Sequence, residues 1–449
     1  MKRLVLIVLL SAFPVSRAWC QNPNTPWLPV GLNGETGPLG TLTESEENEL
    51  SLGIGVGGSY YGTASSNNAS QENVGSYTVT PNIAITERRP RTSFMLQYSP
   101  GFTYSPQGGN QLMQTSIDSL QYRISEKLTL QLGERYMRMN SWFTGLDVNP
   151  TATTGNVIQQ PNESILTTQT VETTSLTTLN LVYQASDSTV TGMGGSFITG
   201  NFSNVQVTLN QPLFNSNSGT GSAYIQHRVY GNNWLGITGT FQRIVTSGGV
   251  KEGADNPSLQ IFYTFAPSAH TSLSLFGGPS YFSSQAETSI LILGVPIPVT
   301  IPTKGWGEQG GATAGWRGPR TSLSATYMHR VSDGGGLSGA VSSDSATGNF
   351  RRQLTEKWTA NMSLIYGHNT SESILFGGTF KRISGTANLN WLMSDHFSMA
   401  FSFARDHLDS SFNNLAGTGA APTTVTNQTL DNNRAWVSIS YNFTRPLGW

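Results

Sequence analysis

The stretch AWVSISYNF at residues 435–443 alternates between apolar and small polar side chains over most of its length. Val437, Ile439, Tyr441 and Phe443 lie on one face, and serine and asparagine residues separate them. A period of two is the pattern of a β-strand that is apolar on one side only. The stretch therefore predicts a β-strand near the end of the chain.

The same alternation recurs from residue 50 onward and is clearest at 94–104, 259–265, 358–366 and 397–403. In a soluble β-sandwich, such apolar faces pack against a second sheet. In a membrane-spanning barrel they face lipid, and the polar faces line the interior. Periodicity alone does not choose between these folds, so the choice depends on the turns and the chain ends.

Short polar turns and long loops are sorted along the chain. The eight expected turns are ERRPRT (87–92), SEK (125–127), SDS (186–188), GNN (231–233), APSAH (266–270), RGPR (317–320), TEK (355–357) and SDH (394–396). Loops rich in Gly, Asn, Ser and Thr are expected near 62–74, 105–113, 143–173, 200–219, 246–257, 284–305, 332–342, 367–377 and 407–432. Tight turns on one side and long loops on the other are typical of bacterial transmembrane barrels. Eight turns joining nine up-and-down pairs predict about 18 antiparallel strands, with both ends on the short-turn side. The range is 16 to 18, because 189–230 has room for one strand or two.

The composition agrees with an all-β membrane protein. Only 11% of the 449 residues are charged and 37% are hydrophobic, whereas a soluble domain carries about 25% charged residues. After the first twenty residues, no apolar run reaches the ~18 residues that a spanning helix needs. The 20 Phe, 15 Tyr and 10 Trp residues argue against a disordered chain. A net charge of −1 argues against a nucleic-acid partner, which would need a basic face.

The first residues predict export. Lys2 and Arg3 precede an apolar run and the small residues around Ala18 and Cys20, which is the pattern of a secretory signal peptide over residues 1–20. Cys20 is the only cysteine, so cleavage after it leaves a mature chain without a thiol. Residues 21–49 are rich in proline and glutamate and predict an irregular periplasmic tail. The alternative is a segment that enters a barrel mouth or binds a basic partner.

Residues 435–443 resemble the terminal β-signal of bacterial outer-membrane proteins, an alternating last strand that closes on an aromatic residue. The chain resembles the porin-like superfamily of outer-membrane β-barrels over residues 50–449. It resembles no characterised subfamily within that superfamily. The resemblance implies that the barrel-assembly machinery binds Val437, Ile439, Tyr441 and Phe443. The chain continues to Trp449, and Pro446 favours Phe443 as the aromatic residue of the signal.

Aromatic residues near the short turns predict a girdle at the membrane interface, where amphipathic rings are favoured. They are Tyr183, Trp234, Tyr263, Phe265, Trp358, Trp391 and Phe397.

Motifs for enzymatic chemistry are weak. Gly53, Gly55 and Gly58 match a dinucleotide-binding fingerprint, but they lie inside an alternating strand rather than between a strand and a helix. The six histidines show no metal-ligand spacing. The segment 406–410 holds aspartate, histidine and serine, and a polar loop explains it better than a hydrolase site, since nothing pairs a serine with a histidine base. We therefore expect no enzyme, no cofactor and no metal.

Charged residues on the polar faces are the candidate pore lining. They are Arg123, Arg135, Arg228, Arg330, Arg351, Arg382 and Glu308. The facing of Glu308, and of the further carboxylates Asp118 and Asp406, is less certain than that of the arginines. Like charges in a pore bias which ions enter, although scattered, mutually compensating charges are the alternative interpretation.

The apolar segment 289–302 falls in an expected long loop, and its three prolines exclude a central strand. It has three possible roles: a constriction inside the barrel, a contact with a neighbouring protomer or lipid, or an extended hairpin above the membrane.

The sequence thus predicts a passive diffusion pore for small hydrophilic solutes, since barrels of this size leave an open channel. The alternative is a non-conducting or partner-gated component of a polysaccharide export or surface-assembly system. The expected surroundings are outer-membrane lipid, the assembly machinery and, as a possibility, further copies of the chain.

Overall fold

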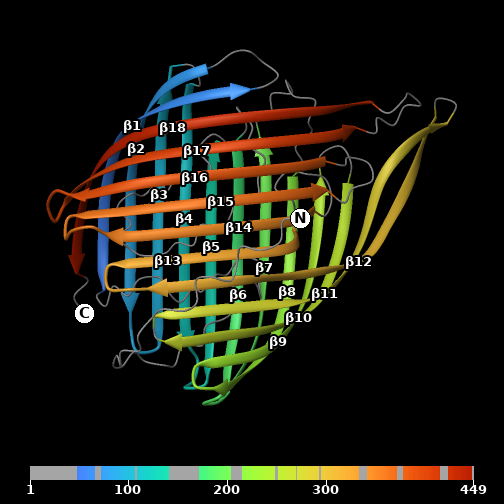
Figure 1. The fold of residues 1–449 in the computed structure, drawn as a ribbon, viewed down its shortest axis with the longest axis horizontal. Coiled ribbons are helices and arrows are strands. Elements are labelled where there is room, and N and C mark those ends of the chain that lie inside the picture. Colours follow the sequence, from blue (N-terminus) through green and yellow to red (C-terminus); the bar gives the residue numbers. More distant parts are fainter. Residues whose placement is uncertain are drawn as a thin grey trace, which may run out of the picture.

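The computed structural model describes residues 48–65, 72–106, 109–140, 171–203, 215–247, 251–268, 270–292, 295–332, 341–371, 378–414 and 423–446. These residues form one antiparallel sheet of 18 strands, in which neighbours in the chain are neighbours in the sheet (Figure 1). The expected signal peptide at 1–20 and nearly all of the expected tail at 21–49 lie outside the described residues.

The strands have the following bounds. They are β1 (Glu49–Ser65), β2 (Glu72–Arg88), β3 (Thr92–Ser105), β4 (Gly109–Arg123), β5 (Leu128–Asn140), β6 (Val171–Ser186), β7 (Thr189–Ser203), β8 (Asn215–Tyr230), β9 (Asn233–Ser247), β10 (Lys251–Ser268), β11 (Thr271–Ile292), β12 (Val295–Arg317), β13 (Thr321–Ser332), β14 (Val341–Gln353), β15 (Trp358–Ser371), β16 (Gly378–Leu392), β17 (Phe397–Asn414) and β18 (Thr423–Pro446).

The sheet closes on itself because the first and last strands pair. β1 lies antiparallel to β18 over its whole length, from Glu49 opposite Pro446 to Ser65 opposite Leu430. The fold is therefore the predicted all-β, up-and-down barrel of 18 strands, with both ends of the ladder on the short-turn side. The ambiguous segment 189–230 contains two strands, β7 and β8. No helix among the described residues is long and apolar enough to cross a membrane.

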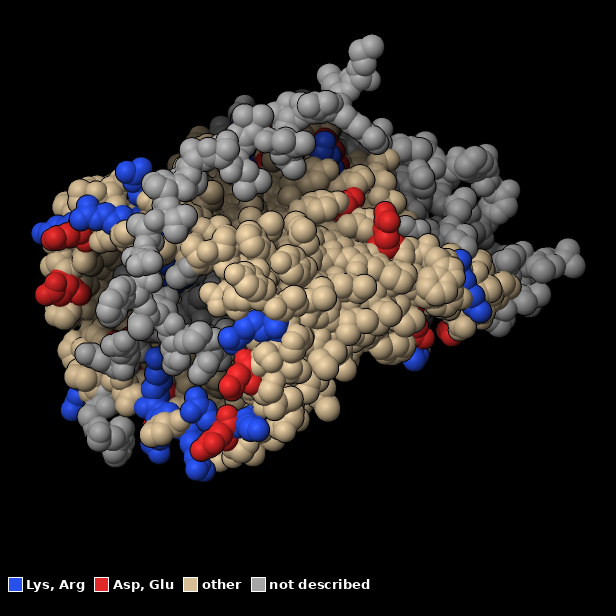
Figure 2. All heavy atoms as spheres, turned by 60° about the horizontal axis from the view of Figure 1, so that its bottom comes forward, with Lys and Arg blue, Asp and Glu red and all other residues tan. Residues whose placement is uncertain are grey.

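The two faces of each strand differ as the alternation predicts. In β10 the side chains of Leu259, Ile261 and Tyr263 are exposed, whereas those of Gln260 and Thr264 are buried. The exposed apolar residues belong to the outer face and the buried polar residues to the inner face, because a closed barrel has no second sheet to cover its outside. In the view of Figure 2, charged side chains lie mainly toward the edges of a broad uncharged surface.

The short turns lie where the sequence predicts them. On the opposite side of the barrel, several segments expected to be long loops are strands instead. The long loops expected near 105–113, 246–257, 284–305 and 407–432 are mostly strand, since β17 runs to Asn414 and β18 already begins at Thr423. The strands continue past the apolar band of the outer face. There both faces of a strand are polar, so the apolar–polar alternation that identifies a strand disappears from the sequence.

The apolar segment 289–302 is the tip of a hairpin formed by β11 and β12. Its prolines lie within β12, where Pro296 is opposite Leu291 and Pro302 is opposite Gln285. β13 pairs with β12 only from Gly310 onward, so this part of β12 is an edge strand, where proline is tolerated. The hairpin projects from the barrel wall at the right of Figure 1, which favours the extended hairpin among the three roles.

Candidate functional site

The inner face of the barrel can be assigned strand by strand, because partners across an antiparallel ladder point to the same side of the sheet. Gln260 of β10 donates a hydrogen bond from Nε2 to Oε1 of Gln309 on β12, at 3.0 Å. That contact spans β11 on the inner side and fixes the inward parity of three neighbouring strands. The candidate site is this inner wall.

All six predicted arginines have inward parity. Arg123 lies opposite Thr129, and Arg135 lies between Ile117 and Leu176. The others are on the same face as buried neighbours: Arg228 with Gln226, Arg330 with Met328, Arg351 with Thr347, and Arg382 with Ser384. The inward assignment does not by itself give them a role in selectivity, which stays a prediction.

The prediction for Glu308 is wrong in its facing. Glu308 lies opposite Pro279 and is shifted by one residue from the inward Gln309, so it belongs to the outer face. Asp118 is also on the outer face, where it lies between Leu96 and Glu134. Asp406 points inward and is buried.

The inward arginines occupy two levels. Arg123 is the last residue of β4, and Arg228 and Arg351 are each two residues from the ends of β8 and β14; we call these three the turn-side band. Arg228 is held there by Trp234, whose ring centroid is 5.0 Å from the guanidinium carbon. Arg135 and Arg330 lie farther along their strands, nearer the long loops.

Two inward arginines are fully buried. Arg382 donates a hydrogen bond to Oδ1 of Asp406 at 2.9 Å, and their side chains are only 2% and 8% exposed. Asp406 therefore compensates the charge of Arg382. Arg434, which the sequence analysis missed, stacks over Trp436 at 4.9 Å. Its even spacing from Ser438 and Ser440 could have placed it on the inner face.

Buried carboxylates on the inner wall were also missed. Glu172 and Glu252 are both buried with inward parity. Ser284 donates a hydrogen bond to Oε1 of Glu252 at 2.7 Å. Beyond the turn-side rim, the described inner wall thus carries Glu172, Glu252 and Asp406 together with Arg135, Arg330, Arg382 and Arg434.

The outer face has an apolar band that ends in a row of ionisable side chains. From Trp358 to Tyr366 the band covers eight residue steps, about 26 Å along the strand at ~3.3 Å per residue. Transmembrane β-barrels carry an apolar band of about 25 Å. The row consists of side chains that are direct partners across five strands: His329, Asp344, His368, Lys381 and Asp409.

The aromatic side chains predicted to form a girdle face outward, with one exception. Trp358 and Trp391 stack on the outer face with centroids 5.4 Å apart, and Phe397 packs against Tyr441 at 5.0 Å. Trp234 instead faces inward beneath Arg228 and is buried.

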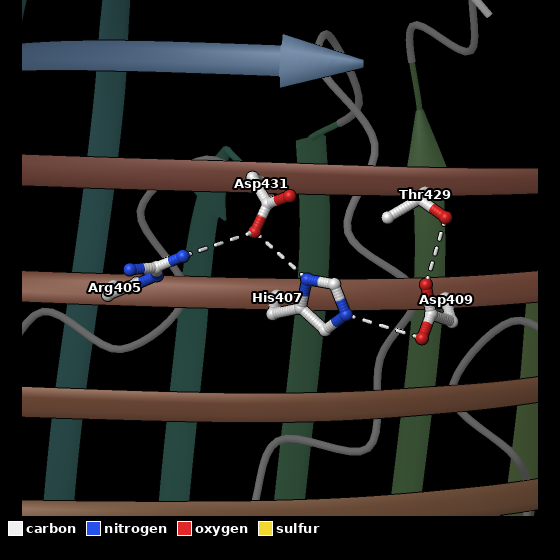
Figure 3. Close-up of polar contacts among 5 residues, drawn as sticks. All are labelled: Arg405, His407, Asp409, Thr429 and Asp431. Atoms are coloured by element: carbon white, nitrogen blue, oxygen red, sulfur yellow. Dashed lines mark hydrogen bonds and ion pairs between the residues drawn. The ribbon is translucent and has the colours of Figure 1, made fainter. Parts of the chain in front are cut away.

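The segment 406–410 does not form a hydrolase site, and it lies in β17 rather than in a loop. His407 contacts Oδ1 of Asp431 at 2.9 Å and Asp409 at 3.3 Å on the outer face (Figure 3). Ser410 and Asp406 have the opposite parity and are buried inside. The cluster lies beyond the apolar band, where the hydrogen bond with Asp431 raises the pKa of His407.

Other chemical motifs also fail to form sites. Gly53, Gly55 and Gly58 lie within β1, and the next element among the described residues is another strand, β2. Among the residues that the structure describes, no three histidine, cysteine or carboxylate side chains gather as metal ligands would.

No family model matches the chain, and no curated protein matches it. Solved structures do resemble it. The ferric-catecholate import receptor Fiu of E. coli K12, in its open form, is 8% identical with a TM-score of 0.42, over 87% of this chain and 81% of that chain. Acinetobacter baumannii OccAB4 is 12% identical with a TM-score of 0.38, over 89% of this chain and 99% of that one. Pseudomonas aeruginosa OccK2 (OpdF) is 10% identical with a TM-score of 0.38, over 88% of this chain and 98% of that chain.

The residues that the structure describes form a closed, antiparallel β-barrel of 18 strands. The strand count and the closure of this barrel follow from its own ladder, in which β1 pairs with both β2 and β18.

Proposed function

We propose that this barrel lies in the outer membrane and forms a passive diffusion pore for small hydrophilic solutes. The supporting observation is the closed ring of 18 strands, with a polar inner face inside an apolar outer band. Barrels of about this size enclose a channel that side chains alone do not fill. In such barrels the short turns face the periplasm and the long loops face the exterior.

We further propose a modest preference for anions. Arg123, Arg228 and Arg351 form the turn-side band, where the field of a narrow aqueous channel acts on entering ions. Ser343, the partner of Arg330, lies eight residues along β14 from Arg351, which is about 26 Å at ~3.3 Å per residue. This exceeds the ~8 Å screening length at physiological salt, so the two levels act separately and the preference weakens as salt rises.

We also propose three partners for this barrel: outer-membrane lipid, the barrel-assembly machinery and a second copy of the chain. The apolar band fits outer-membrane lipid, and the alternating end of β18 fits recognition by the assembly machinery. Asp118 and Glu134 are direct partners on the outer face, and carboxylates are unfavourable against lipid. A second copy of the chain at β4 and β5 would relieve that cost.

One observation favours the second candidate, a barrel that opens only with a partner. Ile244 and Ala254 are buried on the inner face, and Phe282 and Val331 pack against them. This apolar cluster brings β13 against β9–β11 on the loop side of the interior and narrows the passage there. An export or assembly component of this kind would be closed in isolation.

Swelling of proteoliposomes in isosmotic glycine separates the two candidates. The diffusion pore predicts rapid swelling with the purified barrel and none with a large, impermeant dextran. A folded barrel that produces no swelling would contradict the diffusion pore and favour the partner-gated candidate.

A further inference from the structure

The pairing of neighbouring strands is interrupted between β12 and β13, on the loop side of the barrel. These strands pair only from Gly310 opposite His329 to Arg317 opposite Ser322. Above that point β12 continues into the hairpin with β11, while Val331 at the end of β13 packs against Ile244 and Ala254. The end of β13 therefore turns toward the inner face of β9 and β10.

A small recess of about 50 Å³ lies near this contact, on the inner side of β8–β13. These strands are neighbours in the sheet (Figure 1). Uncharged polar residues predominate in the lining of the recess: Thr220, Thr240, Gln242, Asn256, Gln260 and Gln309. Arg330 also lines it, and Phe276 and Met328 supply apolar surface. His329 and Val331 reach it as well, because the end of β13 turns toward the inner wall.

Phe276 can lie flat along this wall because its neighbour in β12 is a glycine. A Cβ at Gly311 would be 2.6 Å from Cζ of the Phe276 ring and even closer to the backbone oxygen of Tyr327. The absence of a side chain at position 311 thus creates a flat apolar surface beside the amide groups.

Two buried carbonyl oxygens in the recess require hydrogen-bond donors. Asn256 and Gln260 are 2% and 4% exposed. Their Oδ1 and Oε1 atoms accept no hydrogen bond from any residue that the structure describes. Gln260 uses its Nε2 for Gln309, and Gln242 donates its own Nε2 to Ser218 at 3.0 Å. A buried acceptor without a donor is costly, so a solute that brings donors gains by binding here.

We propose that this recess is a binding site for a neutral, polyhydroxylated solute of the sugar class, a proposal that rests on the pore function and narrows its substrate. Sugar hydroxyl groups donate to Asn256 and Gln260 and accept from Arg330. The apolar side of a sugar ring fits Phe276 and Met328. A simple carboxylate offers acceptors only and leaves both carbonyl oxygens unpaired.

Saturation-transfer NMR on the detergent-solubilised barrel tests this, with glucose and propionate as probes at equal concentration. Glucose should give a signal at least fivefold stronger than that of propionate. Asn256→Leu and Gln260→Leu should each reduce the glucose signal at least fivefold. Gln131→Leu, an inward glutamine of β5 outside the recess, should leave it unchanged, and a heat-shifted mobility on gels confirms that each variant is folded.

Each outcome decides the proposal separately from the pore function. Propionate binding as strongly as glucose, binding of neither probe, or equal glucose signals in all three variants would overturn the sugar site. If the barrel swells liposomes but binds no glucose, the pore function is supported and the sugar site is refuted. If the barrel binds glucose but does not swell liposomes, the sugar site is supported and the pore function is refuted.

Discussion

The buried pair of Arg382 and Asp406 allows a quantitative prediction. Asp406→Asn preserves the size of the side chain but leaves the charge of Arg382 without its carboxylate. Two unit charges about 4 Å apart attract by about 4 kcal/mol at an effective dielectric constant of about 20. Breaking one partner of a buried pair typically costs about 3–5 kcal/mol. Because both side chains are less than a tenth exposed, we expect a loss near this range.

The assay is equilibrium unfolding in urea of the barrel in lipid vesicles, followed by tryptophan fluorescence. The matched control is Asp255→Asn, because Asp255 forms a longer 3.9 Å pair with Arg243 in which the two side chains are 43% and 67% exposed. An exposed pair contributes about 1 kcal/mol or less. Equal losses in the two variants would refute the assignment of Arg382 and Asp406 as a buried, mutually compensating pair.

The same variant has an electrical consequence. Neutralising Asp406 removes one negative charge from the inner wall, so the anion preference should increase. A reversal potential in a salt gradient that is unchanged between wild type and Asp406→Asn would show that Arg382 lies outside the conducting path.

Three further predictions follow from the inner wall, the topology and the last strand. Replacing Arg123, Arg228 and Arg351 together by glutamine should shift the reversal potential toward cation selectivity while conductance persists; an unchanged potential would exclude the turn-side band as the selectivity element. Cysteines introduced at Glu126 and Glu356 in the short turns should be shielded from impermeant thiol reagents on intact cells, whereas cysteines at the exposed Ser203 and Ser247 should be labelled, and the reverse pattern would invert the topology. Phe443→Ala should leave unassembled, protease-sensitive chain in the periplasm, and normal assembly of that variant would contradict the β-signal.

The strand count could be predicted because the short turns lie directly beside the apolar band. At Trp358 and Phe397 the turn ends and the apolar alternation begins within one residue, so turns and strands are sharply separated in the sequence. On the loop side the signal is absent. Arg405, Asp406 and His407 alternate between outside and inside in β17, yet all three are charged or polar and resemble a loop in the sequence.

The facing of individual residues was harder to predict where neighbouring side chains do not define parity. Glu308 lies in the glycine-rich stretch GWGEQGG, which contains too few apolar residues to mark the outer face. Trp234 was expected outside as an aromatic residue beside a turn, but its position opposite Arg228 places it inside. The recess depends on contact between β13 and strands far from it in the sequence, for which no local pattern exists.

The central claim is that the interior of this closed barrel is a continuous aqueous passage. Single-channel recording of the purified, folded barrel in a planar lipid bilayer tests it most directly. We predict stepwise conductance without any partner protein, with a modest anion preference that declines as salt is raised. A barrel that inserts into the bilayer but shows no current steps at any voltage would contradict the claim.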